Sequence, residues 1–362
     1  MNKLEIEIDD DKENEEENDF YEEIINFFNN PFKNYLNEEH DISYNKWINK
    51  DNNLQFLCSY FKIPKSEEEI KKIIKRRDYS CELKLLKWIT EDIEHKQTCI
   101  KISNTKTKLN RHNDILPYKY NCVTTNNEIP NENNYVNASL IEGPFKEDKN
   151  LFIATQGPLS GTLFSFWSMV IFYKINLIIM LSNIIEEGRE KSECYWPIDK
   201  GKDLILQNEN NEKIIISLIN EKIEIKDSLL IRTLKINEEK EITQIHILCW
   251  NDHDIIKDEL LFKKILNILI NNINDNRINF PDIPILIHCS AGVGRTGTFI
   301  AIYQIIKCLE KIKSLKKEPI LNVFNVVRKL REQRYSMVTD VIQYQLIYTF
   351  CINWVKDNIF VD

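Results

Sequence analysis

The sequence predicts an α/β domain whose central β-sheet is covered by helices on both faces. Segments rich in Ile, Leu and Val indicate strands at 135–141, 151–157, 176–183, 213–219, 223–236, 242–250 and 285–289. Apolar residues three and four apart indicate helices at 160–174, 258–275, 295–313, 319–333 and 340–358. Apolar strands interleaved with helices are typical of a sheet buried on both sides. Pro319 suits a first helical turn, so the helix over 319–333 is expected to begin there.

The first 79 residues differ in character from the rest of the chain. Residues 1–24 contain 12 Asp or Glu and two Lys, which leaves the remainder close to neutral. We expect an acidic, disordered tail over 1–19, with a docking element for a partner as the alternative. Helical spacing in "DFYEEIINFF" and "SEEEIKKIIKRR" predicts a helical N-terminal extension over 20–79. The main domain is expected over 80–362.

Cysteine usage and the N-terminus favour a reducing compartment. The nine cysteines are odd in number and widely spaced, and no C-x-x-C pair occurs, which argues against a zinc site or a disulfide scaffold. The acidic N-terminus does not resemble a signal peptide, and the apolar run 166–181 is broken by Lys174 and Asn176. We therefore expect no membrane segment and a cytoplasmic protein, with the nucleus as an open alternative.

One loop concentrates the glycines of the chain. The stretch "IHCSAGVGRTGT" (287–298) holds three glycines in six positions, although the chain has only 8 Gly. An apolar strand precedes this stretch and an amphipathic helix follows it. Such a unit presents successive backbone N–H groups and the positive end of a helix dipole, which together bind an anion. The Gly-Lys-Ser/Thr of a Walker nucleotide-binding loop is absent.

Cys289 and Arg295 stand at the two ends of this loop. N–H dipoles and a guanidinium favour the thiolate form of a cysteine, and a thiolate is the nucleophile that would attack the bound anion. Arg295 can hold two oxygens of a phosphoryl group at once. The alternative is a buried structural cysteine beside a tight turn.

The stretch "HCSAGVGRTG" resembles the H-C-x5-R-[ST] loop of the protein tyrosine phosphatases. Dual-specificity and lipid phosphatases share C-x5-R, so the loop alone does not give the subclass. Other segments follow one another in the same order and at the same spacing as in the tyrosine-specific members. These segments are "NYVNASLI", "TQGPL", "EEGREKSECYWP", a Trp-x-Asp at 250–252 and "LREQRYSMV". The resemblance covers about 80–358. It implies the cysteine-phosphatase fold, a mixed, highly twisted sheet flanked by helices.

The resemblance implies a catalytic role for five matching residues. Cys289 would be the nucleophile and Arg295 the residue that holds the phosphate. Asp252 would protonate the departing phenolate and later accept a proton from water; a plain polar turn, "NDHD", is the local alternative. Thr296 would help the thiolate leave in the second step, and Gln343 would hold the attacking water.

Other matches are implied to bind substrate or to support the site. The loop residues that would surround the phosphate are Ser290, Ala291, Gly292, Val293, Gly294 and Arg295. Asp114 would hold the substrate backbone, and His112 and His253 would wall the phosphotyrosine slot. The supporting set is Glu186, Lys191, Trp250, His288, Arg334 and Thr339.

Three supporting residues have a specific implied part. Glu186 would orient Arg295. His288 would organise the catalytic loop by hydrogen bonding, with a packed core histidine as the alternative. Arg334 would act on the site through its neighbours, and a surface salt bridge is the alternative for it.

Four positions depart from the family pattern. Asn251 replaces the proline that stiffens the acid loop, and His112 and His253 replace aromatic walls of the slot. Thr339 replaces the first of two water-positioning glutamines, while Gln343 keeps the second.

The leading hypothesis is a phosphatase that hydrolyses phosphotyrosine in proteins through a cysteinyl-phosphate intermediate. The departures motivate a first alternative, a weakly active or inactive domain that binds phosphotyrosine. A phosphoinositide phosphatase is the second alternative, although Ser290 and Val293 stand where such enzymes often carry lysines. No cofactor or metal is implied, because the nucleophile and the acid are both side chains, and no nucleic-acid partner is expected.

Overall fold

A computed structural model of the chain describes residues 10–29, 57, 59–97, 108–126 and 134–360. Its helices are α1 (Asp10–Asn29), α4 (Glu67–Arg76), α5 (Tyr79–Gln97), α6 (Leu163–Phe172), α7 (Glu259–Asn279), α8 (Gly294–Ser314), α9 (Val323–Gln333) and α10 (Val341–Asn358), with a 3₁₀ turn η2 at Ser160–Thr162. None of the helices in these described ranges is both long enough and apolar enough to cross a bilayer.

The central sheet has nine strands in the described part of the chain. Their order is β2 (Cys122–Thr124), β3 (Tyr135–Ile141), β4 (Phe152–Thr155), β12 (Ile285–His288), β5 (Leu177–Met180), β11 (Lys240–Ile247), β10 (Leu229–Ile236), β9 (Lys213–Ile225) and β8 (Leu204–Gln207). The middle strands β4, β12, β5 and β11 are parallel, and the outer strands pair antiparallel. The expected mixed sheet is therefore confirmed.

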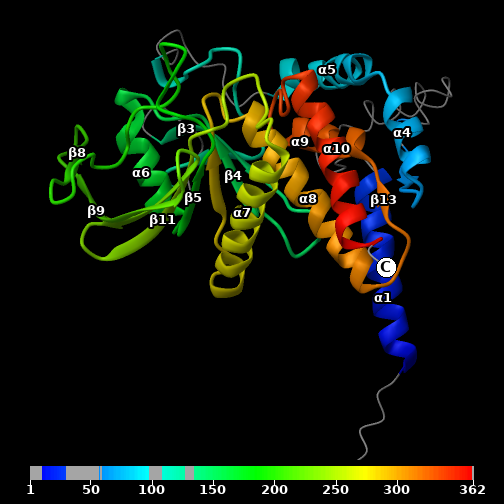
Figure 1. Cartoon of the computed structure of the whole chain (residues 1–362). Coiled ribbons are helices and arrows are strands. Elements are labelled where there is room, and N and C mark those ends of the chain that lie inside the picture. Colours follow the sequence, from blue (N-terminus) through cyan, green and yellow to red (C-terminus); the bar gives the residue numbers. More distant parts are fainter. Residues whose placement is uncertain (1–9, 30–56, 58, 98–107, 127–133, 361–362) are drawn as a thin grey trace, which may run out of the picture.

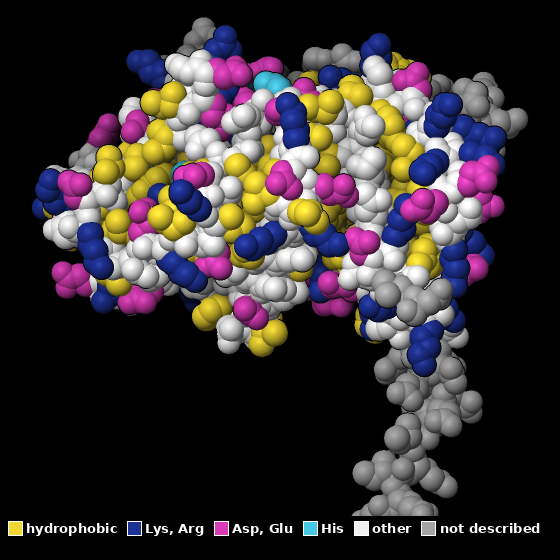
Figure 2. All heavy atoms as spheres, in the orientation of Figure 1, with side chains coloured by type: hydrophobic (Ala, Val, Ile, Leu, Met, Phe, Trp, Pro, Cys, Tyr) yellow, Lys and Arg dark blue, Asp and Glu magenta, His cyan; other side chains and the backbone are white. Residues whose placement is uncertain are grey.

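Helices cover both faces of this sheet (Figure 1). Alternate residues of β5 point to opposite sides, so Leu177 and Ile179 join the core beneath α7, α8, α9 and α10, while Ile178 and Met180 join the core beneath α6. Two short two-stranded pairs lie outside it: β1 (Phe61–Lys62) with β13 (Ile320–Leu321), and β6 (Ile185–Glu186) with β7 (Arg189–Glu190). Figure 2 shows acidic and basic side chains interspersed over one face, as the near-neutral charge after residue 24 leads one to expect.

The predicted start of one helix is wrong. The helix expected over 319–333 begins at Val323, because Pro319 is followed by the strand β13 and Asn322 caps the helix. The Asn322 side chain accepts a hydrogen bond from the backbone N–H of Asn325 at 3.0 Å. A side-chain cap satisfies an N–H group that otherwise has no partner at a helix start, and it outweighs the preference of proline for the first turn.

The N-terminal region also differs from the expected division of the chain. Helix α1 begins at Asp10, inside the segment 1–19 that was expected to be disordered, while residues 1–9 lie outside the described part. The packing of α1 starts later: Ile24, Phe27 and Phe28 are buried against the domain. The helical segment expected over 20–79 is described only in part, because residues 30–56 and 58 are outside the described ranges.

The boundary expected between residues 79 and 80 falls inside a packed cluster. Glu82 on α5 accepts hydrogen bonds from Arg77 at 3.0 Å, from Tyr344 at 2.7 Å and from Tyr348 at 3.1 Å. Burial raises the pKa of both tyrosines, so they donate as neutral phenols. This buried cluster joins α5 to α10, the helix that carries Gln343, and makes residues 77–82 part of the same folded unit.

Replacing Phe28 with alanine is expected to lower the free energy of unfolding by about 3–5 kcal/mol, because it deletes a fully buried aromatic ring between α1 and α9. Urea denaturation measures the change. Glu22→Ala is the matched control, since Glu22 is exposed on the same helix and should change stability by less than about 0.5 kcal/mol. Equal stability of the two variants would show that α1 is not part of the cooperative core.

Candidate active site

The catalytic loop joins the middle of the sheet to the start of α8. Strand β12 ends at His288 and the helix begins at Gly294, so residues 289–293 lie where the parallel strands end. Gly292 has φ +70°, and a Cβ atom there would lie 2.1 Å from the carbonyl oxygen of Thr155. Only glycine fits that backbone, which keeps the loop tight against β4.

Cys289 is buried at the base of this loop, 3% exposed. The Thr296 hydroxyl donates to its Sγ at 3.3 Å. A hydroxyl in that position stabilises negative charge on sulfur. The two residues that the sequence assigned to nucleophilic attack and thiolate departure are therefore in direct contact.

Arg295 connects the catalytic loop to two other segments. Its Nη1 donates to Glu186 Oε1 and to the backbone oxygen of Trp250, each at 2.6 Å. Burial opposes its charge, but the nearby charges of Cys289, Glu186 and Asp252 outweigh burial and raise the pKa of Arg295. The guanidinium is therefore a permanent cation beside the thiol, held in place from both sides.

Asp252 lies within reach of two cations. Lys191 Nζ donates to its Oδ2 at 2.6 Å, and Arg295 Nη2 donates to its Oδ1 at 3.2 Å. Partial burial would raise the pKa of Asp252, but the Lys191 hydrogen bond and the Arg295 charge prevail and lower it. In this state Asp252 is a carboxylate, and it must gain a proton before it can act as an acid.

Thr339 and Gln343 meet at the start of α10, beside the catalytic loop. The Thr339 hydroxyl donates to Asp340 Oδ2 at 2.8 Å and lies 3.4 Å from Gln343 Oε1. A Cβ atom on Gly294 would lie 2.7 Å from the Thr339 hydroxyl. The Thr339 hydroxyl therefore has two acceptors within hydrogen-bond reach, and Asp340 is the nearer of the two.

Arg334 is fully buried behind the loop rather than in a surface salt bridge. Its Nε donates to the carbonyl of Gly292 and its Nη2 to that of Ala291, each at 3.0 Å. Two donors that hold adjacent carbonyls on the far side turn the intervening N–H groups toward the anion site. An effect of Arg334 on the site through these neighbours stays a prediction.

His288 is also buried, and both of its ring nitrogens have partners. Nε2 lies 2.8 Å from the Tyr195 hydroxyl and Nδ1 lies 3.1 Å from the carbonyl oxygen of Cys289. Burial lowers the pKa of His288 to about 4, so the ring is neutral at pH 7. It holds the backbone of Cys289 without adding charge.

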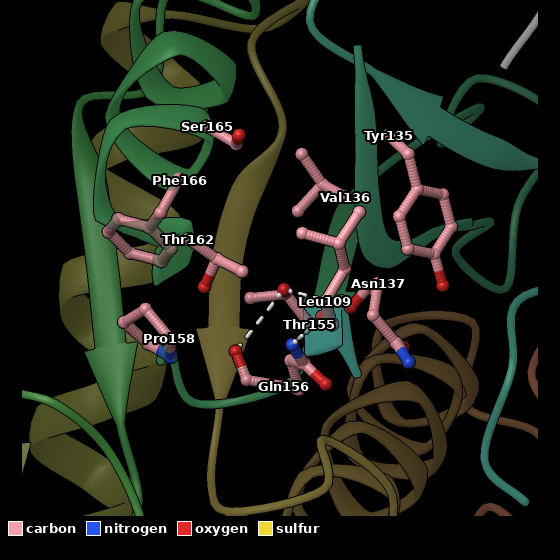
Figure 3. Close-up of a pocket in the computed structure, with 10 residues that line it drawn as sticks. All are labelled: Leu109, Tyr135, Val136, Asn137, Thr155, Gln156, Pro158, Thr162, Ser165 and Phe166. Carbon is pink, nitrogen blue, oxygen red and sulfur yellow. Dashed lines mark hydrogen bonds between the residues drawn. The ribbon is translucent and has the colours of Figure 1, made fainter. Parts of the chain in front are cut away.

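The segment that carries His112 and Asp114 is fastened to the sheet by amide side chains. Gln156 accepts from the backbone N–H of Arg111 at 2.8 Å and donates to the Leu109 carbonyl at 2.9 Å. Figure 3 shows Leu109, Gln156 and their neighbours around a small pocket of about 10 Å³, too small for more than a water. This pocket supports the segment and contains none of the predicted catalytic residues.

His112 and Asp114 are both exposed on this segment. Although His112 is exposed, partial burial of its ring is the main cause that lowers its pKa. The charges of Asp114 and Asp252 oppose that shift, and the charges of Arg111 and Lys191 add to it. His253 belongs to the acid loop, with a side chain 71% exposed. The two histidines thus lie on different segments, and their role as walls of the slot stays a prediction.

A family model described as "Protein-tyrosine phosphatase" matches residues 106–353. The chain belongs to the protein tyrosine phosphatase family. Human tyrosine-protein phosphatase non-receptor type 12 is 35% identical over 266 residues, which cover 72% of this chain and 32% of that protein. Mouse receptor-type tyrosine-protein phosphatase alpha is 36% identical over 70% of this chain and 30% of its own length. The chain thus spans about a third of the length of these relatives.

The solved catalytic domain of human protein tyrosine phosphatase non-receptor type 18 aligns with a TM-score of 0.65 and 24% identity. The alignment covers 79% of this chain and 99% of that one. This likeness confirms the tyrosine phosphatase fold that the sequence motifs predicted.

Sequence reasoning missed three residues that shape this phosphatase-family site. Arg111 donates to the carbonyls of Gly157 and Glu190, and so joins the His112 segment to the hairpin before Lys191. Tyr195 holds His288, and Asp340 holds Thr339. Each of the three lies within a recognised motif or next to a residue that the sequence analysis named. That position in the sequence is the signal that could have identified them.

Proposed function

We propose that the chain hydrolyses phosphotyrosine in proteins through a cysteinyl-phosphate intermediate. One observation carries the proposal: Arg295, at the end of the loop that begins with Cys289, donates to Asp252 at 3.2 Å. The next residue, Thr296, donates through its hydroxyl to Cys289 Sγ at 3.3 Å. Nucleophile, phosphate-holding cation and acid therefore converge on one point. Relatives named tyrosine-protein phosphatases support the same reaction.

In the first step, the substrate phosphate enters the N–H cradle and takes hydrogen bonds from Arg295. The Cys289 thiolate attacks phosphorus, the bond from phosphorus to the phenol oxygen breaks, and protonated Asp252 gives its proton to the departing phenolate. Arg295 stabilises the charge that spreads over the phosphoryl oxygens. Trp250, packed in the core with its carbonyl bound by Arg295, fixes the start of the acid loop.

In the second step, a water attacks the phosphorus of the cysteinyl phosphate while Asp252 accepts its proton. Gln343 orients that water with its side-chain amide, because the Thr339 hydroxyl has the carboxylate of Asp340 as its nearer acceptor. The bond from sulfur to phosphorus breaks, and the Thr296 hydroxyl stabilises the thiolate that leaves. Inorganic phosphate and the ionised Cys289 are regenerated, and the proton remains on Asp252 for the next cycle.

The depth of Cys289 favours phosphotyrosine over phosphoserine. A thiol that is 3% exposed lies below the protein surface, so a long aryl phosphate reaches it more readily than a short serine or threonine phosphate. Ser290 and Val293 bring no positive charge to the loop, which argues against a polyanionic inositol headgroup. Complexes of phosphatase non-receptor type 18 with phosphorylated peptides support a peptide substrate.

Turnover of three substrates tests the proposal. The purified chain should release phosphate from a phosphotyrosyl peptide, and far more slowly from the same peptide with phosphoserine or from a phosphoinositide. Binding of the phosphotyrosyl peptide without turnover would favour the inactive binding domain instead.

Whether the acidic segment 1–19 docks a partner stays a prediction, which a pull-down with and without that segment addresses.

A further inference from the structure

Side-chain contacts hold the acid loop, residues 250–254, close to the catalytic loop. Some of these contacts involve the reacting groups and one does not. Arg295 and Lys191 both hold the carboxylate of Asp252, at 3.2 and 2.6 Å. A bound phosphate competes for Arg295, and Asp252 itself changes charge in each chemical step. These anchors therefore weaken at the moments when the loop must stay in place.

Another anchor lies outside the reacting groups. His253 Nδ1 lies 3.0 Å from Asp340 Oδ2, and Asp340 stands at the N-terminal end of α10. The same carboxylate oxygen accepts the hydroxyl hydrogen of Thr339 at 2.8 Å. Asp340 thus connects the acid loop to the segment that holds the attacking water, and neither chemical step consumes this contact.

The backbone of the acid loop needs such a contact. His253 has φ +53°, a left-handed conformation that residues other than glycine adopt at a cost and keep only when their surroundings hold them there. Asn251 lacks the ring that would fix φ at a proline in this position. A loop with one strained residue and no proline depends more than usual on side-chain anchors.

We propose that Asp340 is a positioning residue for catalysis: through His253 it keeps the acid loop closed, so that Asp252 stays aligned with the leaving group. The inference rests on the proposed function, because it assigns the alignment of the proposed acid to this contact. Loss of the contact lowers the closed fraction and slows the step that needs proton donation. Binding of the phosphate in the catalytic loop should change little, because the contacts described for the Asp340 carboxylate are with His253 and Thr339 rather than with residues 289–295.

Two other charged groups lie beside this contact. Asp252 Oδ2 lies 3.8 Å from His253 Nε2, and Lys191 Nζ donates to the same oxygen of Asp252 at 2.6 Å. His253 therefore lies between the carboxylates of Asp252 and Asp340, and its contact with Asp340 is the one that leads away from the reacting groups.

The test compares Asp340→Asn with Asp357→Asn, the same chemical change near the other end of α10, where Asp357 pairs with Lys263 on the surface. Asp340→Asn should lower kcat for phenyl phosphate about two- to five-fold, the range of a partly exposed polar contact, with little change in KM. The loss should be smaller for an aryl phosphate with a more acidic phenol, which needs less protonation as it leaves. Hydrogen exchange should rise in the peptide containing 250–254 and not in β9.

A double-mutant cycle with His253→Asn identifies the route, since asparagine tolerates the left-handed backbone. If Asp340 acts through His253, Asp340→Asn should have no further effect in that background. If Asp340→Asn lowers kcat as much in that background as in the unmodified chain, Asp340 acts through Thr339 and the proposal is overturned. The proposal is also overturned if Asp340→Asn gives the same kcat and the same hydrogen exchange as Asp357→Asn. Failure of the proposed function would look different: the unmodified chain would not hydrolyse aryl phosphates, while hydrogen exchange would still report the contact.

Discussion

Cys289→Ser is expected to lower kcat on aryl phosphates by about 10⁴-fold or more, because a serine hydroxyl in this loop is not ionised at neutral pH and makes a poor leaving group from phosphorus. Nothing else in the anion cradle changes: Arg334 still holds the Gly292 and Ala291 carbonyls, and Arg295 still faces the loop. Affinity for a phosphotyrosyl peptide should therefore stay measurable by calorimetry while turnover disappears.

Cys81→Ser is the matched control for this experiment, because Cys81 is exposed on α5, outside the catalytic loop. It should keep full activity and full affinity. Substantial turnover by a clean preparation of Cys289→Ser would rule out the thiolate mechanism. Loss of phosphopeptide affinity together with turnover would mean that the substitution damages the loop itself, which the melting temperature would reveal.

The sequence predicted the core of this fold because its signals are local. The strand β3 was predicted at its observed bounds, 135–141, since a run of apolar and β-branched residues is sufficient to mark it. The start of α9 could not be predicted in the same way. Pro319 favoured an early start, and only the pairing of β13 with β1, more than 250 residues earlier in the chain, assigns residues 320–321 to a strand.

The site shows the same division between local and distant information. The catalytic loop is one continuous segment, so its glycines, Cys289 and Arg295 could be read directly from the sequence. The contact from His253 to Asp340 spans 87 positions and depends on how two loops meet. His253 was noticed as a departure from the family pattern and Asp340 was missed, and nothing in the one-dimensional pattern indicates that the two residues touch.

Asp252→Ala is expected to lower kcat about 10²–10⁴-fold on phenyl phosphate, because the phenolate must then leave without a proton. The loss should be much smaller for aryl phosphates whose phenols are more acidic, since those anions leave unaided. Asp254→Ala is the matched control: Asp254 lies in the same loop but pairs with Lys257, away from Arg295. An equal loss on all leaving groups, or a larger loss in the control, would remove Asp252 from the role of acid.

The pH profile gives an independent check on the same residue. In the free protein, Lys191 and Arg295 outweigh the effect of burial and lower the pKa of Asp252. The protonated form, which can donate a proton, is therefore lost early as pH rises. The value of kcat/KM should fall over the same pH range, which forms the alkaline limb of its pH profile. A bound phosphate dianion takes Arg295 and adds negative charge beside Asp252, which must raise its pKa in the complex. The alkaline limb of kcat should therefore lie at higher pH than that of kcat/KM. Asp252→Asn, which cannot titrate, should abolish the limb in kcat; a limb that persists there would have to belong to another group.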